Sequence, residues 1–179
     1  MIIKSNKIKG EFTHWVGIKH KESVLNGQFR LLPSSLPSKP TGLWLSWNGG
    51  WEYFCKYDYT DWMKGKTCLK AEIKPNLNIW LIDSFVDFIE VWNKFIYPEK
   101  INLNTDKFQY EICSFIKLYE SKQKGKDFWE WLQTELKIDG VALTKIGQCE
   151  TRMSTWLYGW DVASVVLFNP KNVVLKWKN

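Results

Sequence analysis

Four side chains between residues 44 and 51 are spaced so that they could form one small binding site. The run GLWLS at 42–46 predicts a short strand, and the Asn-Gly-Gly sequence at 48–50 predicts a tight turn. Apolar residues at positions 51, 54 and 55 follow at helical spacing, which predicts a helix directly after the turn. Such a strand, turn and helix would gather four side chains around one concavity: Trp44, Ser46, Trp47 and Trp51.

Tryptophan is unusually frequent in this chain, with 12 among 179 residues. Indole is large and mostly apolar, so some of these rings must fill the core. Twelve exceed what a core of this size needs, and we therefore expect several to line a groove. Trp44 has two open interpretations, because a ring in a short apolar strand serves equally well in the core or as a stacking surface.

Four titratable residues are further candidates for a site. His14 lies in a predicted strand at 11–18 and is one of two histidines, so it is either structural or functional depending on what faces it. Asp161 precedes an apolar run, where a half-buried carboxylate needs a partner, and Arg152 is the candidate for a structural ion pair. Glu150 lies in a polar segment, where a carboxylate is either solvated or catalytic.

Several common chemistries are excluded by the absence of their motifs. The sequence has no GxxxxGK[ST] phosphate loop, no GxGxxG after a strand, no GxSxG elbow and no HExxH. Its four cysteines lack the CxxC spacing of a zinc ribbon, and two histidines make a multi-histidine metal site improbable. We therefore expect no metal.

Length, composition and charge are those of one ordinary globular domain spanning residues 1–179, with 45% hydrophobic and 25% charged residues. The net charge of +6 either favours an anionic partner or serves solubility. The N-terminal sequence lacks the apolar run of a signal peptide, and no apolar run is long enough to span a membrane. We therefore expect a cytoplasmic protein with reduced thiols and no membrane partner.

The order of predicted elements is strands, then clustered helices, then strands. Residues 1–10 form a polar lead-in. Helices are expected at 85–96, at 105–119 and from Asp127 to Leu136, with a polar segment at 148–155. Strands are expected at 11–18, 27–31, 42–46, 67–73, 78–82, 140–145, 156–168 and 173–177. Helices do not alternate with strands, which favours an α+β fold with a largely antiparallel sheet and flanking helices.

Three of these segments together resemble the ADP-ribosyltransferase fold, the split antiparallel β-sandwich shared by poly(ADP-ribose) polymerases and bacterial toxins. In that family an early strand carries a His or Arg, and a second strand carries an aromatic residue or Ser beside a helix. A later strand carries the catalytic Glu and is often followed by an F-[DN]-P turn. Here the early strand offers His14, GLWLS offers Trp44 and Ser46, and ASVVLFNP at 163–170 offers the late strand and turn.

The resemblance implies a transferase that uses NAD as its substrate. It implies that Trp44 or Trp47 stacks on nicotinamide and that His14 holds the ribose and nicotinamide, with Ser46, Trp51 and Ser164 as further NAD-binding residues. Backbone N–H groups near Gly49 and Gly50, or Arg30 and Arg152, would meet the pyrophosphate. One departure matters, because the expected position of the family glutamate holds Ser164, so Asp161 or Glu150 would have to supply the carboxylate.

Three functional hypotheses follow. The first is an NAD-dependent ADP-ribosyltransferase that modifies a protein or nucleic acid. The second, motivated by Ser164, is a catalytically silent member of the same fold that binds a nucleotide or partner. The third is a single-stranded nucleic-acid or sugar binder that uses interleaved tryptophans and lysines between positions 44 and 64.

Overall fold

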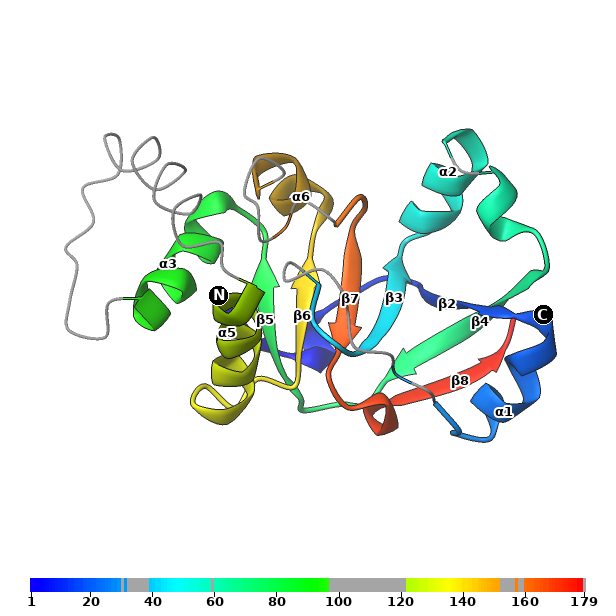
Figure 1. The fold of residues 1–179 in the computed structure, drawn as a ribbon, viewed down its shortest axis with the longest axis horizontal. Helices are drawn as coiled ribbons and strands as arrows, with labels where there is room; N and C mark the ends of the chain where they lie inside the picture. Colours follow the sequence, from blue (N-terminus) through cyan, green and yellow to red (C-terminus); the bar gives the residue numbers. More distant parts are fainter. Residues whose placement is uncertain are drawn as a thin grey trace.

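A computed structural model describes residues 1–29, 31, 39–58, 60–96, 122–151, 157 and 160–178 (Figure 1). Eight strands of this part of the chain form one sheet, in the order β1-β5-β6-β7-β3-β2-β4-β8. Their bounds are β1 Ile2–Lys4, β2 Phe12–Gly17, β3 Leu43–Trp47, β4 Lys66–Ile73, β5 Asn78–Ile82, β6 Gly140–Leu143, β7 Ser164–Leu167 and β8 Val173–Trp177.

The sheet confirms the expected mixed α+β class with largely antiparallel pairing, since β5–β6 is the only parallel ladder among the described strands. It is not divided into two separate sheets, as a split sandwich would be. β3 pairs with both β7 and β2, which joins the strands into one continuous surface. The β2–β3 ladder has only two registered pairs, Phe12 with Trp47 and Thr13 with Ser46, so this junction is narrow. Figure 1 shows β4 and β8 crossing obliquely relative to β5–β7.

Two helices cover one face of the β5–β6–β7 part of the sheet. These are α3 (Phe85–Ile96) and α5 (Lys122–Thr134), and the apolar stripes of both point into one hydrophobic cluster. Trp80, Phe88, Phe128 and Leu132 lie at its centre and are inaccessible to solvent. Ser84 caps the start of α3, because its hydroxyl accepts a hydrogen bond from the Asp87 backbone N–H at 3.2 Å.

The opposite face is buried mainly by the sheet itself. Val165, Leu167 and Ala142 from the central strands β7 and β6 share a second cluster with Leu69 of β4 and Leu175 of the edge strand β8. Every strand from β2 to β8 contributes a buried residue to this second cluster, so this core runs along most of the sheet. Because β6 and β7 are buried on both faces, they have continuous apolar sequences instead of alternating ones.

Three shorter helices complete the described fold: α1 (Lys21–Leu25), α2 (Gly50–Tyr57) and α6 (Lys145–Thr151). The first four residues of the polar segment expected at 148–155 belong to α6, a helix that the sequence did not predict. The buried residues of α6 are Gly147, Gln148 and Thr151, so no apolar periodicity marks this helix.

Three other predictions about elements also need correction. Residues 2–4, expected in a lead-in, form the edge strand β1, which is too short to produce a recognisable pattern. The strand expected at 27–31 is absent from the described residues 27–29 and 31. Within the strand expected at 156–168, the described residues 160–163 are not in a strand and β7 begins at Ser164. The backbone carbonyl of Asp161 accepts a hydrogen bond from the Gln148 side-chain amide at 3.2 Å instead of from a neighbouring strand.

The helix expected at 105–119 lies outside the described residues. Among the helices that the structure describes, none has the length and apolar character needed to cross a membrane.

Candidate functional site

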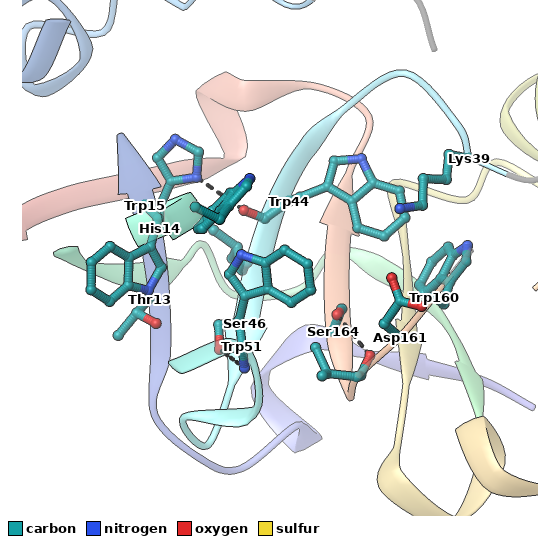
Figure 2. A pocket seen from close by; sticks show the side chains of 13 residues that line it. Thr13, His14, Trp15, Lys39, Trp44, Ser46, Trp51, Trp160, Asp161 and Ser164 are labelled. Atoms are coloured by element: carbon teal, nitrogen blue, oxygen red, sulfur yellow. Dashed lines mark hydrogen bonds between the residues drawn. The ribbon is translucent and has the colours of Figure 1, made fainter. Parts of the chain in front are cut away.

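A pocket of about 320 Å³ opens where β2, β3 and the start of β7 meet α2. Figure 2 shows His14 on the β2 side and Asp161 on the β7 side, with indole rings between them. Five of the 12 tryptophans line this pocket: Trp15, Trp44, Trp51, Trp62 and Trp160. The expectation that several tryptophans border a concave surface is therefore confirmed.

The turn between β3 and α2 gives this corner its shape. Asn48 and Gly49 adopt left-handed backbone conformations, with φ of 51° and 71°, which reverse the chain within two residues. The Ser46 hydroxyl then accepts a hydrogen bond from the Trp51 backbone N–H at 3.0 Å, which satisfies a free donor of the first helical turn. The predicted strand, turn and helix are confirmed.

Three of the four side chains predicted to gather here do line the pocket: Trp44, Ser46 and Trp51. Trp47 does not. Successive strand residues point to opposite faces, so Trp47 lies on the other face of the sheet from Ser46. There it packs on the ring of Phe12, its partner on the neighbouring strand, with 5.8 Å between the ring centroids. Its indole N–H donates to the Lys9 carbonyl at 3.0 Å.

His14 contacts the neighbouring strand directly. Its Nδ1 lies 3.0 Å from the Trp44 carbonyl oxygen, and because a carbonyl only accepts, Nδ1 must carry the proton. Burial lowers the pKa of His14 below 6.5, and the bond to Trp44 offsets this only in part. The imidazole is therefore neutral at pH 7, which leaves the Nε2 lone pair able to accept a hydrogen bond.

The late-strand candidates lie on the opposite side of the pocket from His14. Ser164 is the register partner of Ser46, and its hydroxyl donates to the Val162 carbonyl at 2.9 Å. Asp161 is exposed at the rim, and Trp160 beside it is buried, with its ring 4.4 Å from that of Trp44. Asp161 and Ser164 therefore line the same pocket as the candidate residues on β2 and β3.

Glu150 is not brought to the pocket. It belongs to α6, and its carboxylate accepts a hydrogen bond from the backbone N–H of Phe85 at 2.8 Å, at the start of α3. An acidic group there stabilises the positive end of the α3 dipole. Arg152, and with it the proposed Asp161–Arg152 ion pair, lies outside the described residues, as does Arg30.

Sequence reasoning missed Glu52, which lies in the first turn of α2. Its carboxylate accepts hydrogen bonds from the hydroxyls of Thr13 at 2.6 Å and Ser46 at 2.7 Å, and the Cys68 thiol lies 3.7 Å away. Burial alone would raise the pKa of Glu52, but the donors together lower it, so the group is ionised at neutral pH. An acidic residue in the first turn after a glycine turn was the available sequence signal.

Trp15 also faces this carboxylate. Its indole N–H is buried and has no hydrogen-bond partner among the described residues. The Trp15 side chain nevertheless lies close enough to the carboxylate to contribute to the lowering of the Glu52 pKa.

A second pocket, of about 580 Å³, lies on the other side of Asp161 and Val162. Trp47, Gly49 and Lys145 are among its lining residues, so the fourth predicted tryptophan borders this neighbouring space. Asp161 and Val162 line both pockets.

Among the residues that the structure describes, no group of three or more His, Cys, Asp or Glu side chains is placed to hold a metal ion. Comparison of the chain with protein-family models, with curated proteins and with solved structures found no match.

Proposed function

We propose that the protein is an NAD-dependent ADP-ribosyltransferase-like enzyme that transfers ADP-ribose to a protein or nucleic acid. One observation carries the proposal. The three segments that resemble the family are far apart in sequence, yet His14 on β2, Ser46 on β3 and Ser164 on β7 belong to adjacent strands and line one pocket. A site shared by three strands requires this adjacency.

The pocket offers the groups that cleavage of a nicotinamide–ribose bond requires. When that bond breaks, its electron pair leaves with nicotinamide, and positive charge develops on the ribose. In the proposal, the Asp161 carboxylate stabilises this charge, and Nε2 of neutral His14 accepts a hydrogen bond from a ribose hydroxyl. The nucleophile of the acceptor then bonds to the ribose carbon and releases its proton to Asp161 or solvent. Trp44 and Trp51 supply faces for the nicotinamide ring.

A catalytically silent nucleotide-binding protein is the second candidate. Ser164 favours it, because a neutral hydroxyl that already donates to Val162 cannot stabilise a cation as a carboxylate would. In this alternative NAD binds without being cleaved.

Nicotinamide release from NAD, measured chromatographically with and without added protein, RNA or DNA, distinguishes the candidates. The enzyme proposal predicts release by the wild type and a loss of about 100-fold or more in Asp161→Asn, since removing one electrostatic stabiliser has effects of that order. Glu130→Gln, an exposed change on α5, is the charge-matched control. Thermal stabilisation by NAD without release would establish the silent alternative, and neither signal would refute both.

A further inference from the structure

The lysines of this chain are concentrated at one end of the molecule. The segments around β2, β3, β4 and β8, residues 5–28, 43–74 and 170–178, contain 12 lysines and six acidic residues. The segments around β5, β6 and β7 with their helices, residues 78–96 and 122–167, contain seven basic and nine acidic residues. Figure 1 shows β4 and β8 at the end of the sheet that lies away from α3 and α5. One end of the protein is therefore basic, and the other is slightly acidic.

The lysines of β4 and β8 share one face of the sheet with the first pocket. Lys176 of β8 lies opposite Lys70 of β4 in the ladder, and Lys70 lies opposite Thr13 of β2. Thr13 in turn lies opposite Ser46 of β3, and both of these residues line the pocket. Side chains that are opposite one another stand on the same face, and neighbouring strands are about 4.8 Å apart. Lys70 is therefore one strand away from the pocket, and Lys176 is two strands away.

A depression of about 650 Å³ on this face is lined by Lys70, Lys176 and Lys178, which we call the lysine face. Two carboxylates also line it, and each is already paired. Glu72 accepts from Lys176 at 2.6 Å. Glu11 lies 3.1 Å from the Lys178 ammonium. Lys70 forms no ion pair within the described part of the chain, and the residue directly opposite it is another lysine, an arrangement that destabilises a sheet unless an anion joins them.

The excess of positive charge remains when the neighbouring groups on this face are counted. Glu52 is a third carboxylate, because its side chain lies 3.7 Å from the Cys68 thiol of β4. Lys66 stands on the same side of β4 as Lys70, since the two are an even number of positions apart. Lys74 continues this alternation just beyond the strand, where its backbone N–H still donates to the chain that precedes β8. Five lysines therefore stand against three glutamates.

An aromatic ring borders the lysine face. Trp177 lines the same depression and is 47% exposed. The Lys21 ammonium lies 4.5 Å from the centroid of its ring. Surfaces that bind single-stranded nucleic acid combine ammonium groups for the phosphates with exposed rings on which bases stack. A duplex keeps its bases inside the stack, so an unpaired strand is the form that can extend from this face into the adjoining pocket.

We propose that the lysine face is a docking surface for a single-stranded nucleic acid, which under the proposed function is the acceptor of ADP-ribose. Only this acceptor role rests on the proposed function, because binding itself needs no NAD. A strand that crosses Lys176 and Lys70 toward Thr13 carries an unpaired base to the pocket. There a nucleophilic atom of the base bonds to the ribose carbon, nicotinamide departs with the electron pair of the broken bond, and the proton passes to Asp161 or to solvent.

Fluorescence anisotropy of the full chain with labelled oligonucleotides of about 12 nucleotides tests the proposal, with uridine RNA, thymidine DNA and duplex DNA as separate arms. At least one single strand should bind, and three phosphate contacts should lower its affinity about 20-fold between about 50 and 200 mM salt. Lys70→Gln combined with Lys176→Gln removes two contacts. The affinity at low salt should then fall at least about tenfold, and the effect of salt should shrink to about threefold.

Lys94→Gln combined with Lys137→Gln is the matched control, because it removes the same charge from two exposed positions in the other half of the molecule. This variant should keep both the affinity and the effect of salt. Trp177→Ala should weaken binding at least about fivefold and leave the effect of salt unchanged, since it removes a stacking surface and no phosphate contact.

Four results would overturn the proposal: no binding of either single strand, equal losses in the two double variants, a duplex bound as tightly as the single strands, or binding to phosphatidylserine vesicles without binding to oligonucleotides. Oligonucleotide binding without nicotinamide release from NAD would support the docking surface and refute the catalytic proposal. Release of nicotinamide without oligonucleotide binding would do the reverse, so the two proposals can fail separately.

Discussion

Removal of the Glu52 carboxylate should destabilise the protein measurably. Glu52→Ala breaks hydrogen bonds to Thr13 and Ser46, whose residues are 1% and 6% exposed. Hydrogen bonds to a charged group contribute about 1.5–3 kcal/mol each. Glu52 is itself partly exposed, and solvent reduces the contribution of such a charge. We therefore expect the free energy of unfolding to fall by about 2–3 kcal/mol.

Urea denaturation followed by far-UV circular dichroism measures this change, which should lower the midpoint and leave the slope unaltered. A double-mutant cycle with Thr13→Val should return a coupling of about 1 kcal/mol, because the two residues share a bond. Glu130→Ala is the matched control on an exposed helix surface. A loss below about 0.5 kcal/mol, or no coupling with Thr13, would refute the account of this cluster.

The pH dependence of this contribution has a definite sign. The pKa of Glu52 in the folded protein lies below its ordinary value of 4.5. The stabilisation is therefore complete above pH 4.5 and is lost as the pH falls through the folded pKa. The difference in unfolding free energy between the wild type and Glu52→Ala should shrink over that window.

Three further predictions concern the pocket and its supports. Because burial lowers the pKa of His14 below 6.5, the unfolded chain binds its proton more readily, so wild-type stability should fall as the pH drops below 6.5, and less steeply in His14→Gln. Trp160→Ala should cost about 3–5 kcal/mol in urea denaturation, since this ring is 2% exposed. Gly147→Ala should cost about 2 kcal/mol or more, because its Cβ would collide with the Ile82 carbonyl oxygen, whereas Gly17→Ala, with its nearest neighbour at 3.5 Å, should cost less than about 1 kcal/mol.

The corner around β3 was predictable because its signals are local. Apolar residues at 42–46, a turn at 48–50 and helical spacing afterwards identify the strand, turn and helix without reference to distant residues. The α3 helix was equally clear, since its apolar stripe is long. In the helices α2 and α3, the spacing of apolar residues in the sequence identifies the buried face.

The rest of the site depends on contacts that have no local signal. Glu52 matters because Thr13 lies next to Ser46 on a paired strand, and nothing near position 52 indicates that pairing. Glu150 was an equally good carboxylate candidate in the sequence, yet α6 places its carboxylate next to the Phe85 backbone N–H instead of in the pocket. Period counting also fails for α6 itself, whose buried side is small and polar.

The order of the strands in the sheet determines when the pocket can exist. β3 borders the pocket and pairs with β7, whose residues follow about 120 positions later in the chain. Contacts between such distant segments form late, because the intervening loop must close first. A chain still being synthesised, or one that ends before β7, therefore carries His14, Trp44 and Ser46 without a completed site. Ligand binding should consequently report the integrity of the whole chain and not of any fragment.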